Sequence, residues 1–80
     1  MNFKNRIRNY LLEEEFTFTV YKNKINLVNY KDIIDFSDTL ITIKHDDGYI
    51  LIKGKKLIVS KLLNQEMLVE GNINLIELRW

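Results

Sequence analysis

The segment Thr39–Lys53 reads TLITIKHDDGYILIK and carries the strongest structural signal in the chain. Apolar residues alternate with other residues on both sides of a central Asp-Asp-Gly. Asp-Gly between two such runs is typical of a tight β-hairpin, because glycine adopts positive φ without a Cβ clash. We therefore predict a hairpin with its tip at Asp46–Gly48. One face of that hairpin should carry Ile41, Ile43, Ile50 and Ile52.

The two-residue period also appears on the N-terminal side of this hairpin. Phe16, Phe18 and Val20 alternate with residues suited to a strand surface, which indicates a half-buried strand. Lys22–Lys24 is predicted to form a turn, because its central asparagine tolerates positive φ. A second strand should begin at Ile25.

On the C-terminal side, glycines interrupt two further β-rich runs. We interpret Gly54-Lys55 as a turn and Gly71 as a bend or bulge within a longer strand. Asn64-Gln65 should form the remaining loop. The core is expected to contain eight of the apolar residues on these runs: Ile41, Ile43, Ile50, Ile52, Leu57, Val59, Val69 and Leu75.

The fold class that follows is mostly β. We predict an antiparallel meander of about six to eight short strands that forms a small barrel or sandwich. Phe3, Ile7 and Leu11 lie on one face of a 3.6-residue period, which predicts one short N-terminal α-helix over residues 1–14. The helix could pack on the sheet, or could bind a partner or a membrane. The whole chain, residues 1–80, is expected to be a single domain, with the β domain at 16–80.

Composition excludes several classes of protein. The chain has no cysteine, so a disulfide framework or thiolate metal site is ruled out. Its 12 Lys and Arg nearly balance its 11 Asp and Glu, which gives no overall attraction to nucleic acid or to an anionic membrane. We expect no secretory signal, because residues 1–12 lack a continuous apolar segment, and the sequence has no apolar run of about 18 residues; the cytoplasm is the default expectation.

Candidate catalytic and metal-binding residues are sparse. His45, the single histidine, precedes Asp46 and Asp47, and this trio could bind a metal or a proton; we favour a solvated hairpin tip. The aspartates at 32, 35 and 38 lack the spacing of a calcium loop. Ser37 and Ser60 lack a nucleophile-elbow motif, and the three glycines are too far apart for a phosphate loop. We predict no enzyme activity, no catalytic, cofactor-binding or metal-binding residues, no cofactor and no small-molecule substrate.

A cluster of lysines allows a second interpretation. Lys53, Lys55, Lys56 and Lys61 could face phosphates, with Tyr30 or Tyr49 stacking on bases, as in a small Sm-like β-barrel that binds nucleic acid. The interpretation we favour is that these lysines solubilise turns and edge strands. Nucleic acid is therefore the alternative partner, and a protein is the expected one.

Two strands lack the usual protection against edge pairing. The run Asn72–Trp80 carries only Glu77 and Arg79 as charges, the strand at 15–21 has none after Glu15, and the chain has no proline. If either strand lies at a sheet edge, it could pair with a partner strand or with a second copy. In a closed barrel, the two strands would instead pair with each other.

Several segments together resemble the YabP/YqfC family of sporulation proteins. They are INLVNYKDI at 25–33, Phe36-Ser37, Ile41 with Ile43, GYILIKGKKLIV at 48–59, and EMLVEGNINLIE at 66–77. The stretches NYKDI and IKGKKL resemble the YqfC branch more closely. The resemblance covers roughly residues 25–78.

This resemblance implies a protein of an endospore-forming bacterium with a non-enzymatic part in late spore assembly. It implies a location in the mother-cell cytoplasm and action through protein–protein binding or assembly. A membrane-associated sporulation protein is one candidate partner, and self-association is another. The family carries over no catalytic residues.

Overall fold

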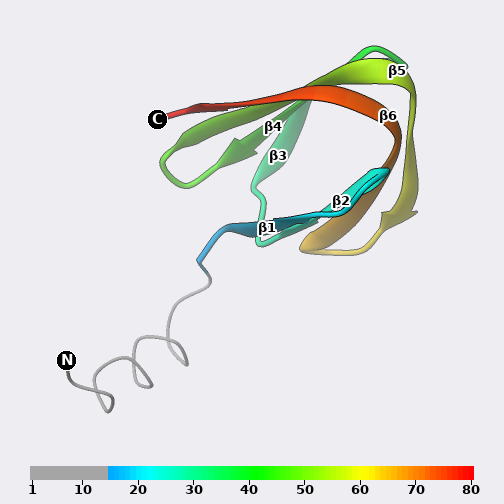
Figure 1. Ribbon diagram of the computed structural model, residues 1–80. Coiled ribbons are helices and arrows are strands. Elements are labelled where there is room, and N and C mark those ends of the chain that lie inside the picture. Colours follow the sequence, from blue (N-terminus) through cyan, green and yellow to red (C-terminus); the bar gives the residue numbers. More distant parts are fainter. Residues whose placement is uncertain (1–14) are drawn as a thin grey trace, which may run out of the picture.

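The computed structural model describes residues 15–80, which form six strands in one antiparallel sheet. The strands are β1 (Thr17–Val20), β2 (Lys24–Val28), β3 (Asp32–Phe36), β4 (Leu40–His45), β5 (Gly48–Leu62) and β6 (Glu66–Arg79). Their order in the sheet is β1-β2-β6-β5-β4-β3. Figure 1 shows β5 and β6 as two long, strongly curved ribbons, so that the sheet folds over on itself.

The mostly β class and the strand number are confirmed, but the sheet does not close into a barrel or divide into a sandwich. Its two ends, β1 and β3, are not paired with each other. The first and last strands are not paired either, because β2 lies between β1 and β6. The predicted helix at 1–14 lies outside the described residues.

The predicted hairpin is confirmed, but Gly48 begins β5 and lacks the positive φ on which the prediction relied. His45 lies opposite Gly48, and the turn between β4 and β5 is Asp46-Asp47. The turn between β1 and β2 also lies where we predicted it, but without positive φ at Asn23; among the described residues other than glycine, Asn29 and Lys56 have positive φ. The local pattern therefore located the turns more reliably than it predicted their backbone angles.

Bulges produce the curvature of β5 and β6. Gly71 has φ 139°, and the register between the two strands shifts beside it. A Cβ on Gly71 would lie 2.6 Å from the carbonyl oxygen of Lys56, so only glycine fits this backbone. The predicted bend at Gly71 is thus confirmed. The predicted turn at Gly54 is wrong, because Gly54 lies inside β5, where a Cβ would overlap the carbonyl oxygen of Asn72.

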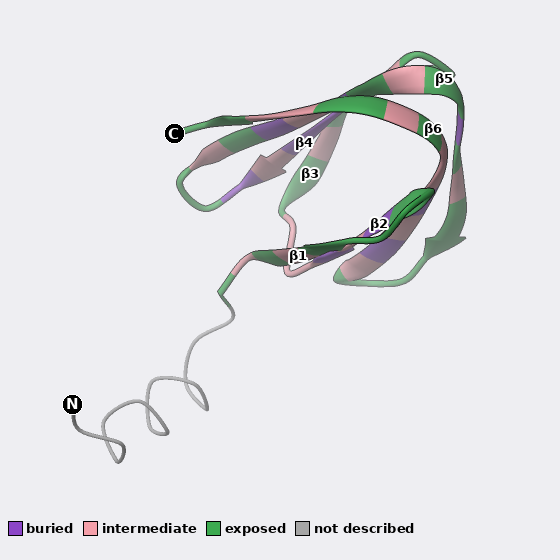
Figure 2. Cartoon of the chain, viewed as in Figure 1, coloured by how far each residue is buried: buried purple, intermediate pink, exposed green. Residues whose placement is uncertain are grey.

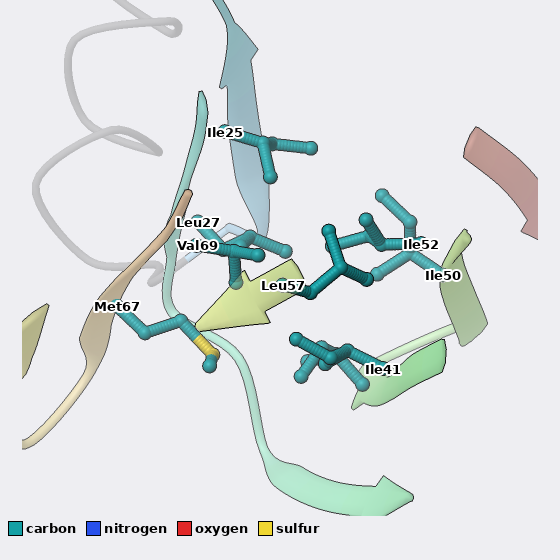
Figure 3. Close-up of a cluster of buried hydrophobic side chains, with 9 residues drawn as sticks. Ile25, Leu27, Ile41, Ile50, Ile52, Leu57, Met67 and Val69 are labelled. Atoms are coloured by element: carbon teal, nitrogen blue, oxygen red, sulfur yellow. The ribbon is translucent and has the colours of Figure 1, made fainter. Parts of the chain in front are cut away.

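The core lies between the two arms of the folded sheet. Figure 3 shows Leu57 between a group from β2 and β6 and a group from β4 and β5. The buried core residues are Ile25, Leu27, Ile41, Ile43, Ile50, Ile52, Leu57, Met67 and Val69. In Figure 2 the buried segments lie on β2, β4, β5 and β6.

Six of the eight predicted core residues are buried, and Val59 packs against the core while partly exposed. Leu75 was wrongly predicted, since its side chain is 49% exposed. The partner of Lys53 is Leu75, whereas the partner of Gly54 is Ile73, so β6 has one extra residue at Asn74. This bulge reverses the alternation and turns Ile76, instead of Leu75, toward the core.

Candidate functional site

His45 is buried, contrary to the prediction of a solvated hairpin tip. Its side chain is only 1% exposed. The ring stacks on Phe16, with centroids 4.5 Å apart, and meets Trp80 edge-on at 4.7 Å. His45, at the end of β4, therefore contacts the residue before β1 and the residue after β6.

The hydrogen bond of His45 belongs to its own turn. Nδ1 accepts a bond from the backbone N–H of Asp47 at 3.2 Å. Within the described residues, Nε2 has no hydrogen-bond partner. Asp46 forms an ion pair with Lys31 at 3.3 Å. Across residues 15–80, no three His, Asp or Glu side chains form a group that could hold a metal ion.

The two serines support the backbone. Ser37 Oγ accepts bonds from the N–H groups of Thr39 and Leu40, which shapes the turn between β3 and β4. Ser60 Oγ donates to the carbonyl of Leu68 at 3.4 Å. Neither hydroxyl is hydrogen-bonded to His45, so the structure does not assemble a serine–histidine pair from these residues.

The lysine cluster is not assembled with free aromatic rings. Lys61 lies 4.0 Å from Glu66, so its charge is partly balanced. The ring of Tyr49 already carries the ammonium of Lys44 at 5.2 Å, and the hydroxyl of Tyr30 donates to the carbonyl of Leu63. Lys53, Lys55 and Lys56 are all exposed. These contacts agree better with solubilising charges than with a base-stacking platform.

The outer edge of β1 is open. The turn to β2 is closed by a bond from the N–H of Tyr21 to the carbonyl of Lys24 at 2.8 Å. Backbone groups alternate between the two sides of a strand, so those of Thr19 face β2 as well. The groups of Phe18 and Val20 consequently point away from the sheet, where β1 has no neighbouring strand among residues 15–80.

Chemically, the β1 edge is unprotected. The segment 16–21 has no charged side chain and no proline, the features that usually discourage strand pairing. Val20 and Tyr21 are both more than half exposed. This edge can accept a strand through the N–H and C=O groups of Phe18 and Val20, with Val20 as an apolar contact.

A second open edge lies on β6. The N–H of Gly54 donates to the carbonyl of Thr39. In this part of β5, the backbone N–H and C=O groups of even-numbered residues therefore point toward β4, and those of odd-numbered residues point toward β6. Their partners in β6 face β5 in return: Leu75, Glu77 and Arg79. The backbone groups of Ile76 and Leu78 therefore point to the other side, which β2 does not reach because it pairs only with Glu66–Glu70.

The other edges contain charges, bulges or a covering turn along part of their length. On β3, Asp32 and Asp35 flank a bulge at Ile34. On β5, the turn after β3 covers part of the edge, because the carbonyl of Asp38 accepts the N–H of Leu57 at 2.9 Å. Charges and bulges of this kind hinder the docking of another strand. The stretch Ile58–Leu62 of β5 also has no strand on its β4 side among the described residues, but it contains a bulge at Ser60 and the charge of Lys61. We therefore consider the edges on β1 and on the end of β6 as candidate binding edges.

A family model described as the YabP family matches residues 19–79. The chain belongs to the YabP family. The match runs from the last two residues of β1 to the end of β6 and so includes both open edges in part or in full. No curated protein and no solved structure matches the chain significantly.

The match confirms the resemblance at the level of the YabP family and suggests a role related to sporulation. Two of those motifs coincide with the long, bent strands of the sheet. GYILIKGKKLIV spans most of β5, and the glycine of EMLVEGNINLIE is the bulge residue Gly71. Within residues 15–80, the structure has no helix long and apolar enough to cross a bilayer.

The sequence interpretation named both edge segments but missed the burial of His45. Proline absence and low charge identified the segments. The signal for His45 was its place in the alternation, since Ile41, Ile43 and His45 share one face of β4. The prediction of a solvated hairpin tip relied instead on the polarity of His45 and of the adjacent aspartates.

Proposed function

We propose that this YabP-family protein has a non-enzymatic role in late spore formation and acts by binding another protein through the edge of β1. The observation that carries the proposal is the open, uncharged edge itself, with Val20 and Tyr21 exposed beside it. A strand added there would gain backbone hydrogen bonds as well as apolar contact. The family match supplies the connection to sporulation.

The finer parts of the proposal rest on the motifs. NYKDI and IKGKKL favour the YqfC branch, for which a membrane-associated sporulation protein is a suitable partner. We place the protein in the mother-cell cytoplasm, where such a partner could present a strand to β1. This arrangement assigns the chain an adaptor role and requires no cofactor.

The test replaces Val20 by proline in an endospore-forming bacterium that encodes this protein. Val20→Pro removes an N–H that points away from β2, so the ladder inside the sheet is kept. Cells that depend on Val20→Pro should form fewer heat-resistant spores than cells with the wild-type protein. Counting survivors after heating measures the effect.

The matched control is Val20→Ala, which removes the same apolar side chain but keeps the N–H. It should reduce spore formation less than Val20→Pro. Circular dichroism of both purified variants checks that the sheet is retained. Normal spore counts with a folded Val20→Pro protein would refute the β1 edge as the binding site.

A further inference from the structure

We infer that the open end of β6, residues 76–80, pairs antiparallel with the same segment of a second copy of this chain. The inference rests on the proposed function, in that the protein acts by binding proteins, and it names a second partner at a second edge. The register we propose is centred on Leu78, so that Leu78 lies opposite Leu78 of the second copy. Such an interface is two-fold symmetric and uses the same surface on both copies.

The backbone groups suit this register. Those of Leu78 and Ile76 point away from β5, as the alternation from Gly54 shows. With Leu78 at the centre, its N–H and C=O meet the same groups of the second copy and exchange two hydrogen bonds. Ile76 then lies opposite Trp80 of the second copy, so the open backbone groups are matched on both sides of the centre.

The charges suit it as well. Glu77 and Arg79 form an ion pair within one chain, with Oε2 2.9 Å from Nη2, so this end of β6 presents no net side-chain charge to an identical strand. In the register centred on Leu78, Glu77 of each copy lies opposite Arg79 of the other. Opposite charges at directly opposed positions stabilise an antiparallel pair, whereas like charges there destabilise it.

Apolar side chains would be covered by this pairing. Leu78 is 45% exposed and Trp80 is 75% exposed, and both lie beside the open backbone groups of β6. A net charge of +1 on the whole chain gives only weak repulsion between copies. These features together favour a second copy over a strand of a highly charged partner.

The rest of the described chain leaves room for the second copy. β2 pairs with β6 only as far as Glu70, six residues before Ile76. At about 3.3 Å for each residue of a strand, roughly 20 Å separate these positions. Because the two strands run antiparallel, the β1–β2 hairpin of each copy lies at the far side from the contact.

The test uses two opposite charge reversals in the full chain, Glu77→Arg and Arg79→Glu. Sedimentation of the purified proteins over a range of concentrations measures the dimer dissociation constant. Each variant alone places like charges opposite each other, and its dissociation constant should rise about tenfold. An equimolar mixture should regain dimers within about threefold of the wild type, because one variant then presents two positive charges at these positions and the other presents two negative charges.

The mixture separates the effect of the contact between copies from the effect of the ion pair within one chain. The internal ion pair between positions 77 and 79 stays broken in both variants, so regained dimers would come from opposite charges across the interface. Two controls change the net charge equally at exposed sites away from the end of β6, Asp35→Arg on β3 and Lys22→Glu in the turn between β1 and β2. They should leave the dissociation constant within about threefold of the wild type.

Three results would each overturn the inference: a wild-type protein that stays monomeric at millimolar concentration, dimers that neither reversal weakens, or weakened dimers that mixing does not restore. Circular dichroism confirms that each variant is folded. None of these results depends on the β1 edge, so failure here and failure of the spore-formation test can be told apart.

Discussion

For single residues, the face on which a side chain lies decides its contribution. His45 continues the alternation of Ile41 and Ile43 and is enclosed by two aromatic rings, whereas Leu75 is turned outward by a one-residue bulge. From polarity alone, His45 would be expected at the surface and Leu75 in the core. The first two predictions therefore substitute residues whose side chains are known to be buried or exposed.

We expect His45 to stabilise the fold chiefly as a flat ring. His45→Ala removes contacts with Phe16 and Trp80 and leaves the N–H of Asp47 without its acceptor, so it should lower the free energy of unfolding by about 2–4 kcal/mol. His45→Phe keeps the ring and should lower it by only about 1 kcal/mol. Urea unfolding followed by fluorescence of the single tryptophan measures both. Equal losses in the two variants would show that the hydrogen bond to Asp47 dominates.

The exposed Leu75 provides a control for a buried charge. Ile50 is fully buried, so Ile50→Asp should abolish the folded state, because an unpaired buried carboxylate costs several kcal/mol in a small domain. Leu75→Asp makes the same chemical change on an exposed side chain and should alter stability by about 1 kcal/mol or less. Circular dichroism at room temperature distinguishes folded from unfolded protein. A folded Ile50→Asp variant would contradict the assigned core.

Among the elements, the long strands β5 and β6 shape the sheet. Their bulges bend both strands, so that the part of β6 beside β2 and the part beyond it belong to different arms of the fold. The bend also ends the contact with β2 and leaves the end of β6 open. One strand thus contributes to the core at its start and forms an open edge at its end.

This bend depends on Gly71. Gly71→Ala must hold φ near 139°, with its Cβ against the carbonyl of Lys56, so it should lower the free energy of unfolding by about 1–3 kcal/mol. Gly71→Asn should cost a similar amount, since this φ lies outside the left-handed region that asparagine tolerates. Asn72→Ala, at an exposed neighbour, is the control and should cost little. Thermal unfolding compares the three, and an unchanged Gly71→Ala protein would contradict the backbone assigned to this position.

Across the whole molecule, the open sheet connects the fold with the proposals. A closed barrel would have paired every strand and offered no edge. Here the two arms enclose the core while β1 and the end of β6 keep open backbone groups on different strands. One copy could therefore bind a partner strand at β1 and a second copy at β6, which would make the protein a connector in an assembly.

Features that depend on neighbouring residues could be predicted from the amino-acid sequence alone. Alternation marked the strands, Asp-Gly marked the hairpin at Asp46–Gly48, and the order of motifs indicated the YabP family before the family match. Both unprotected segments were identified in the same way, because charge and proline content are local properties. These inferences needed only the short-range preferences of the backbone and side chains.

Which strands are neighbours, and which faces are buried, became known only from the folded chain. β2 pairs with β6 across about forty residues of chain, and this pairing separates the first strand from the last. The bulge at Asn74 exchanges the faces of Leu75 and Ile76, and Phe16 reaches His45 from a distant part of the sheet. Side-chain alternation is repeated within each strand, whereas register and bulges are set by the packing of residues far apart in the sequence.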